Sequence, residues 1–180
     1  MIPYKRVDRT LVKKGAIIDF YQDTIELPDK KLVKWDFIMH KGASAIVPMD
    51  ADGKILMVRQ YRNALDRYTL EIPAGGLNPG EDMMTCAIRE CEEETGYKAH
   101  DVVHLIDVNT TVAFCNEKIG VYFTRNLEPS QQNLDEGEYV SIERYSLDEL
   151  LDKIYAGEIT DGKTVAALTA LKVRLMEHSI

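Results

Sequence analysis

Residues 75–97 read GGLNPGEDMMTCAIRECEEETGY, and this stretch decides the fold. It begins as a loop, because Gly and Pro recur at its start. Asp82 is then a suitable N-cap and Gly96 a C-terminal stop, so the sequence predicts a helix over about Met83–Thr95. The segment is therefore predicted to be a loop, a helix and a second loop.

The predicted helix carries more carboxylates than helix propensity explains. At about 100° per residue, Glu90, Glu93 and Glu94 share one face, apart from the apolar stripe that can face the core. Like charges three or four residues apart each destabilise a helix by roughly 0.2–0.5 kcal/mol. Oxygen donors grouped in this way suit Mg²⁺ or Mn²⁺. The cluster indicates a divalent cation site or, alternatively, a solvated acidic face.

The spacing of the fixed residues decides between these alternatives. Gly75, five residues, Glu81 and seven residues precede the run Arg89-Glu90-Cys91-Glu92-Glu93-Glu94-Thr95-Gly96-Tyr97. This pattern resembles the Nudix box, G-x5-E-x7-R-E-U-x-E-E-x-G-U, in which U is a bulky apolar residue. Every fixed position matches, and Cys91 is a mild departure because a buried Cys behaves as a small hydrophobe. The chain is thus identified as a member of the Nudix superfamily, which hydrolyses a nucleoside diphosphate linked to another group.

The rest of the chain predicts strands first and helices later. Two apolar runs joined by a turn at residues 28–31 predict a small antiparallel β unit, and a second hairpin should follow with its turn at residues 50–53. Further on, Ser146 and Glu149 form a capping box that begins a helix. The expected strands are 16–27, 32–39, 43–49, 54–60, 68–72, 102–108, 119–125 and 139–145, and the later helices are 146–155 and 163–177.

This order predicts an α+β fold with a mixed sheet. With the resemblance, the expected architecture is a Nudix-type α/β/α sandwich plus the small N-terminal antiparallel β unit. We expect residues 1–40 to be a dimerisation unit and residues 41–180 to be the Nudix hydrolase domain.

Composition limits the possible partners. The 180 residues include 22 Lys and Arg against 30 Asp and Glu, a net charge of -8, which argues against a nucleic-acid-binding surface. The longest uncharged stretches, Ile72–Gly80 and Val108–Asn116, are far shorter than the roughly 20 residues of a membrane span. The N-terminal region has no apolar segment typical of a signal peptide. Three cysteines without a CxxC pair are typical of a cytoplasmic protein with reduced thiols.

Segments outside the box resemble the branch of the family that hydrolyses ADP-ribose and nucleotide sugars. They are VRQYR at 58–62, LEIPAG at 70–75, LDEGEY at 134–139 and GEITDGKT at 157–164. The N-terminal β unit fits as well, because that branch pairs such a unit across a homodimer. The resemblance implies Mg²⁺- or Mn²⁺-dependent hydrolysis of the pyrophosphate bond of a nucleoside diphosphate sugar. ADP-ribose would give AMP and ribose 5-phosphate.

The resemblance also implies roles for individual residues. The metal ligands would be the Ala74 carbonyl together with Glu90, Glu94 and Glu138. Glu136 would act as general base, with Glu93 close to the site. Physical reasoning adds that Arg89 can orient a glutamate by a bidentate hydrogen bond, that Glu81 can fold back to support the site, and that Gly75 allows a tight turn.

Substrate contacts are expected from bases and from the loop after the box. Arg62 matches a substrate-contacting arginine of the branch, and Arg59 and Lys41 are further candidate phosphate partners. Thr111 and Glu117 could bind sugar hydroxyls. Val112 falls where the branch usually has a proline, so the preferred sugar could differ from ribose.

Two other functions remain open. One is another hydrolase on this scaffold, acting on dinucleoside polyphosphates or oxidised nucleotides, or a diphosphate isomerase. The other is a non-catalytic module that senses a nucleotide. Such a module should have lost box carboxylates, and none is missing here.

Overall fold

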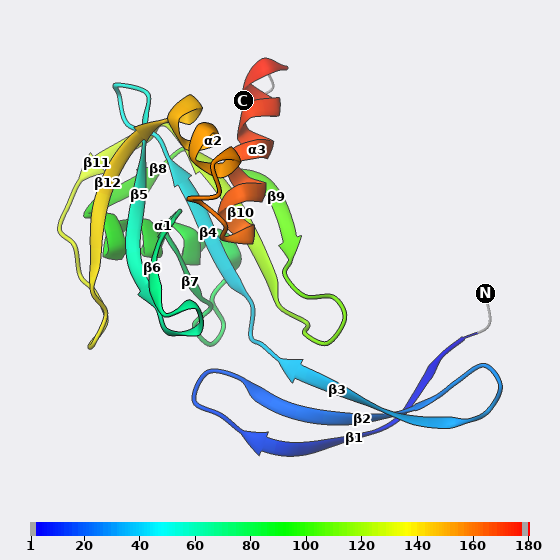
Figure 1. Ribbon diagram of the computed structural model, residues 1–180. Coiled ribbons are helices and arrows are strands. Elements are labelled where there is room, and N and C mark those ends of the chain that lie inside the picture. Colours follow the sequence, from blue (N-terminus) through cyan, green and yellow to red (C-terminus); the bar gives the residue numbers. More distant parts are fainter. Residues whose placement is uncertain (1–2, 178–179) are drawn as a thin grey trace. The chain divides into compact units, whose positions relative to one another are not determined.

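The computed structural model describes residues 3–177 and 180, which form two compact units (Figure 1). Unit 1 comprises the described residues up to Gly42 together with Asn109–Lys118. Unit 2 comprises Ala43–Val108 and the described residues from Ile119 onward. The predicted division after residue 40 did not include segment 109–118.

Unit 1 is built on an antiparallel sheet in the order β1-β2-β3, with β1 (Lys5–Lys14), β2 (Asp19–Glu26) and β3 (Leu32–Met39). Strand β1 was not predicted, because charged residues interrupt its alternation and nearly all its side chains are exposed. It is held to β2 by Arg9, which donates two hydrogen bonds of 2.6 Å to Asp23. Segment 109–118 joins β3 through the Ile38 N–H, which donates to the Phe114 carbonyl at 2.7 Å.

Unit 2 contains a mixed sheet in the order β7-β4-β10-β9. Strand β4 (Ala43–Pro48) runs parallel to β10 (Lys118–Thr124) and antiparallel to β7 (Ala74–Gly76), and β9 is Val103–Asn109. Every residue of β4 is buried, as expected for the centre of a sheet covered on both faces. Strand β7 contains Gly75, the first residue of the Nudix box. Because β4 pairs with β7, strand β4 supports the candidate site directly.

Two smaller sheets complete unit 2. The first is antiparallel in the order β12-β5-β6, with β12 (Val140–Ser146), β5 (Lys54–Arg62) and β6 (Arg67–Glu71), and a short 3-10 helix, Asn63–Leu65, joins β5 to β6. The second pairs β8 (Tyr97–His100) with β11 (Asn126–Pro129). Neither β8 nor β11 was predicted, because both are only four residues long.

The predicted hairpin of residues 43–49 and 54–60 is wrong. Its turn forms as expected, since the Asp50 side chain accepts from the N–H groups of Asp52 and Lys54. Beyond the turn, however, only an isolated bridge joins Met49 to Ile55. The strands separate because β10 and β7 occupy both edges of β4, while β12 and β6 occupy both edges of β5.

Helices cover both faces of the mixed sheet, which confirms the predicted α+β sandwich (Figure 1). On one face, Ile46 and Tyr122 pack against Ala87 and Cys91 of α1 (Met83–Thr95). The opposite face belongs to the larger core, which includes residues of α2 (Leu147–Tyr155) and α3 (Gly162–Met176). Strand alternation explains the division, since successive residues of β4 face opposite sides.

Local capping fixes the helix ends where the sequence predicted them. Asp82 accepts from the N–H groups of Met84 and Thr85 at 3.0 and 3.1 Å, and Gly96 ends α1 with a φ of 71°. The capping box of Ser146 and Glu149 is present at the start of α2. Across residues 3–177 and 180, no helix combines the length and apolar character needed to cross a membrane.

Candidate active site

Close contact between β7 and α1 explains why residue 75 is a glycine. A Cβ on Gly75 would lie 2.0 Å from Glu90 Oε1, so any side chain would displace that carboxylate. Gly75 does not have a positive φ, and the expected tight turn is therefore not its reason. The glycine instead lets the Glu90 side chain lie against the strand.

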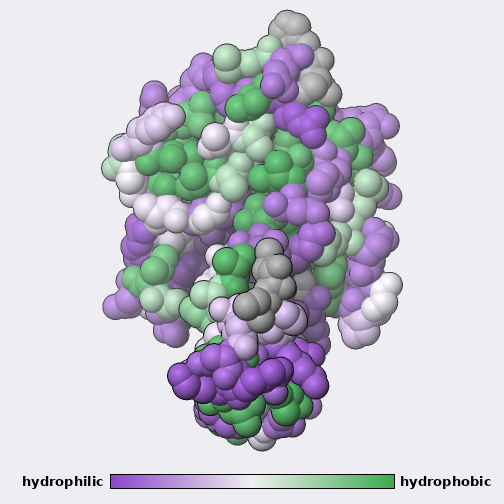
Figure 2. All heavy atoms as spheres, turned by 90° about the vertical axis from the view of Figure 1, so that its right-hand side faces the viewer, coloured by the Kyte–Doolittle hydropathy of each residue, from purple (hydrophilic) through white to green (hydrophobic). Residues whose placement is uncertain are grey.

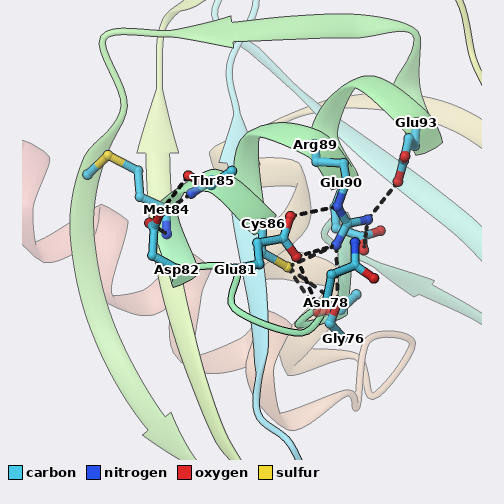
Figure 3. Close-up of polar contacts among 11 residues, drawn as sticks. Gly76, Asn78, Glu81, Asp82, Met84, Thr85, Cys86, Arg89, Glu90 and Glu93 are labelled. Carbon is cyan, nitrogen blue, oxygen red and sulfur yellow. Dashed lines mark hydrogen bonds and ion pairs between the residues drawn. The ribbon is translucent and has the colours of Figure 1, made fainter.

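Arg89 is the centre of the site and binds three carboxylates (Figure 3). It donates to both oxygens of Glu81, at 2.8 and 3.0 Å. Its Nη1 also donates to Glu90 at 2.6 Å and to Glu93 at 2.7 Å, and its Nη2 donates to the Gly76 carbonyl at 3.1 Å. These hydrogen bonds raise the pKa of Arg89, and the one that Arg89 donates to Glu81 has the largest effect. The guanidinium therefore fixes the positions of Glu81, Glu90 and Glu93 at once.

Glu81 closes the loop before α1. Its Oε2 accepts from the Asn78 N–H at 2.9 Å, so the side chain folds back over the loop as the sequence suggested (Figure 3). The hydrogen bonds from Arg89 lower the pKa of Glu81, which keeps this carboxylate ionised. Arg89 thereby connects the loop to the carboxylate face of the helix.

Glu94 is a buried carboxylate with little to compensate its charge. The residue is 2% exposed, and its Oε2 accepts one hydrogen bond from the Ala74 N–H at 2.9 Å. Burial raises its pKa to about 8, and the charges of Glu90 and Glu138 act in the same direction. Burial also raises the pKa of Glu90. A cation beside these carboxylates would stabilise their charged forms.

The carboxylates bind Arg89 and the Ala74 amide, and they do not converge on a common point that a metal ion could occupy. In the described part of the chain, no three His, Cys, Asp or Glu side chains gather closely enough to hold a metal ion. Glu90 and Glu94 still fit a divalent cation chemically, because the half-buried Glu90 and the buried Glu94 are oxygen donors whose pKa values burial raises. The ligand roles predicted for Ala74, Glu90, Glu94 and Glu138 remain predictions.

The loop that precedes β12 carries the other two predicted acidic residues. Glu138 is half-buried and accepts from Gln60 Nε2 at 2.9 Å, and its negative charge contributes to raising the pKa of both Glu90 and Glu94, although burial is the larger cause. Glu136 is exposed and makes no hydrogen bond or ion pair within the described residues. Glu138 is therefore close to the carboxylate cluster, and the base role predicted for Glu136 remains a prediction.

Strand alternation separates the two arginines of β5. Arg59 and Arg62 lie three residues apart and so face opposite sides of the strand. Arg59 pairs with Glu143 of β12, whereas Arg62 donates two hydrogen bonds of 2.7 Å to the buried Glu71. The hydrogen bonds to Glu71 raise the pKa of Arg62, and the charge of Glu94, which lies nearby, acts in the same direction. The expectation that Arg59 shares the site with Arg62 is wrong for this reason.

Three predicted substrate-binding residues belong to unit 1. Lys41 is exposed, while the Thr111 carbonyl accepts from the Phe114 and Cys115 N–H groups in a turn. Glu117 accepts a hydrogen bond of 2.6 Å from the Thr110 hydroxyl. Their substrate roles remain predictions.

Comparison with known proteins decides the family. The NUDIX domain profile matches residues 39–168, well over half of the chain. The chain belongs to the Nudix family.

Named relatives span nearly the whole Nudix chain. It is 34% identical over 172 residues to an ADP-ribose pyrophosphatase of Bacillus subtilis (strain 168), covering 94% of this chain and 93% of that protein. It is 36% identical over 172 residues to a methanol dehydrogenase activator of Bacillus methanolicus, with the same coverage of both. A crystal structure of an ADP compounds hydrolase superposes with a TM-score of 0.86 at 20% identity, covering 97% of this chain and 95% of that chain. The last comparison confirms the Nudix fold.

Three polar residues of the Nudix site were missed from the sequence. They are Gln60, which donates to Glu138, and the pair of Glu71 and Lys163, in which Glu71 accepts hydrogen bonds from both Arg62 and Lys163. Two signals were available: Gln60 and Arg62 alternate on one face of a strand, and Glu71 interrupts an otherwise apolar segment, Leu70–Ala74. Lys163 lies in the segment at 157–164 that resembles the branch, but its partner was not predictable because it reaches Glu71, 92 residues earlier, only in the folded chain.

Proposed function

We propose that this protein hydrolyses the pyrophosphate bond of a nucleoside diphosphate sugar. ADP-ribose is the first candidate, with AMP and ribose 5-phosphate as products. The observation that carries the proposal is the pair of carboxylates on α1, the half-buried Glu90 and the buried Glu94, held by Arg89 and the Ala74 amide. The extended similarity to an ADP-ribose pyrophosphatase supports the choice of substrate.

The proposed cofactor is Mg²⁺ or Mn²⁺, bound by the Ala74 carbonyl, Glu90, Glu94 and Glu138. The cost of burying Glu94, which raises its pKa to about 8, supports a cation at this position. When bound, such an ion neutralises phosphate charge and activates water for attack on phosphorus.

The chain's own residues would orient the site carboxylates and deprotonate the attacking water. Arg89, with Glu81 as its partner, would hold Glu90 and Glu93 in position. Proton transfer is assigned to the loop before β12, with Glu136 as the base that the family resemblance indicates. Its exposed carboxylate is free to accept a proton from water. Glu138 is the alternative base, and single Glu136→Gln and Glu138→Gln variants would distinguish the two by their pH profiles.

A substrate panel tests the proposal. Turnover of ADP-ribose, other ADP-, GDP- and UDP-sugars, dinucleoside polyphosphates and dGTP would be compared at one Mg²⁺ concentration by phosphatase-coupled phosphate release. We expect the nucleoside diphosphate sugars to have the highest kcat/KM. A preference for dGTP or a dinucleoside polyphosphate would refute the substrate class and leave the Nudix chemistry intact.

Two variants test the site itself. Glu90→Gln and Glu94→Gln keep the side-chain size and remove the charge, so each should abolish nearly all turnover. Glu92→Gln is the matched control, because Glu92 lies on the same helix and bonds outward to Ser130 at 2.6 Å. Near wild-type turnover in both site variants would show that these glutamates do not hold the metal.

The N-terminal sheet is proposed as a dimerisation unit for the catalytic domain. A small isolated sheet is marginally stable in water and needs a packing partner. Figure 2 shows hydrophobic side chains at its surface beside hydrophilic ones, and the exposed residues include Val12, Ile17, Leu32 and Trp35. A second copy of the chain is the partner that the family resemblance supports. The substrate remains a small molecule, and the acidic charge argues against nucleic acid.

A further inference from the structure

Glu71, the last residue of β6, is a buried carboxylate between two cations. The residue is 2% exposed. Arg62 donates to it through Nε and Nη2 at 2.7 Å each, and Lys163 donates through Nζ at 2.5 Å. The Thr69 hydroxyl adds a further hydrogen bond of 2.6 Å. Both carboxylate oxygens are therefore satisfied, and the two cations come from different elements, β5 and α3.

This cluster is fastened to the strand that leads into the carboxylate site. Glu71 precedes Ala74 by three residues, and the Ala74 N–H binds Glu94. Between them, the Ile72 N–H donates to the Thr164 hydroxyl at 3.0 Å, which holds the start of α3 against the same segment. Burial raises the pKa of Glu94, and the positive charge of Lys163 opposes this effect in part. Lys163 therefore lies near Glu94 as well as Glu71.

The two cations keep donors for a ligand. An arginine has five N–H donors and a lysine three. Arg62 uses two on Glu71, and Lys163 uses one on Glu71 and one on Asp161. About three donors on Arg62 and one on Lys163 therefore remain. The Arg62 side chain is also partly exposed, so its remaining donors can reach a bound molecule.

The charges within the cluster balance. This indicates that the cluster orients the side chains that bind a ligand and does not attract the ligand by net charge. Arg62 and Lys163 carry two positive charges, while Glu71 and Asp161 carry two negative ones. The cluster therefore adds little net attraction for an anion. A long side chain that is already held in one geometry, however, loses less conformational entropy when it binds a ligand.

We propose that Glu71 is a positioning residue that holds Arg62 and Lys163 toward the bridging phosphates of the substrate, with Lys163 as a second phosphate-binding cation. The inference rests on the proposed pyrophosphatase function and deepens it. The chemistry that this pair recognises is the oxygen atoms of a diphosphate, because the remaining N–H groups of Arg62 and the ammonium of Lys163 match two neighbouring phosphates.

A double-mutant cycle tests the positioning role. Glu71→Gln, Arg62→Ala and the double variant would be compared by KM and kcat for ADP-ribose with Mg²⁺, and by the Kd of ADP in calorimetry. Each single variant should raise KM and Kd about tenfold, as expected for the loss of a charge-assisted hydrogen bond. The double variant should be no worse than the more impaired single variant, because Glu71 acts through Arg62.

Controls separate positioning from general stability. Glu143→Gln removes the partner of Arg59 on the opposite face of the same strand and should leave KM and Kd unchanged. Lys163→Met leaves the pair of Arg62 and Glu71 in place and should still raise KM, which keeps the test available if Glu71→Gln does not fold. Melting temperatures would be measured for every variant.

Distinct results would overturn the proposal. A Glu71→Gln variant with a lower melting temperature and an unchanged KM and Kd would show a structural role only. Independent, multiplicative effects of Glu71→Gln and Arg62→Ala would exclude action through Arg62. If wild-type protein hydrolyses no nucleoside diphosphate sugar, the proposed function fails. Binding of ADP still decides the positioning role in that case, and a wild-type protein that does not bind ADP would overturn it.

Discussion

The folding stability that Glu71 contributes should disappear in acid. Hydrogen bonds from Arg62 and Lys163, with the charge of Lys163, outweigh the opposing effect of burial and lower the Glu71 pKa from 4.5 to about 2. One pKa unit corresponds to about 1.4 kcal/mol. The lowered pKa therefore corresponds to up to about 3 kcal/mol of unfolding free energy. Because the folded-state pKa is the lower one, this contribution is complete above pH 4.5 and is lost as the pH falls toward 2.

Urea unfolding of the wild type and of Glu71→Gln measures this contribution. The difference in unfolding free energy should be largest near pH 6 and should shrink by up to about 3 kcal/mol as the pH falls, down to the lowest pH at which both proteins fold. Glu149→Gln is the control, because the Glu149 pKa is also lowered to about 2 but this side chain is exposed. Its difference should change much less, since solvent screens exposed pairs. A Glu71 difference that stays constant across this pH range would refute the buried, ionised cluster.

Four further outcomes are expected. Millimolar Mg²⁺ should raise the melting temperature of the wild type more than that of Glu94→Gln, because an ion that binds only the folded state stabilises it; equal shifts would contradict a site at Glu94. Gly75→Ala should reduce kcat strongly, because its Cβ would meet the Glu90 carboxylate at 2.0 Å, and unchanged turnover would contradict this packing. Asp82→Ala should lower the unfolding free energy by about 1 kcal/mol in chemical denaturation through loss of the N-cap of α1, whereas no change would mean that the cap is dispensable. Light scattering should give twice the chain mass of 20.4 kDa, and a particle of one chain mass at micromolar concentration would refute the dimer.

Local elements were predictable from the sequence, because their determinants lie within a few residues. The bounds of α1 follow from Asp82 and Gly96, which cap orphan backbone groups of the same helix. The capping box at the start of α2 spans only Ser146 to Glu149. Short strands were less predictable: β1 has an almost wholly exposed, charged surface, so hydrophobic alternation gave no signal there.

The sequence by itself determined the Nudix box, the family, the acidic helix face and the residues that could bind a cation. Only the tertiary structure decided how the rest is joined. It separated β4 from β5 into different sheets, placed Arg59 and Arg62 on opposite faces, and brought Lys163 to a carboxylate 92 residues earlier in the chain. The physical reason is that a helix cap depends on neighbouring residues, whereas strand pairing and the burial of Glu71 and Glu94 depend on which distant surfaces exclude water together.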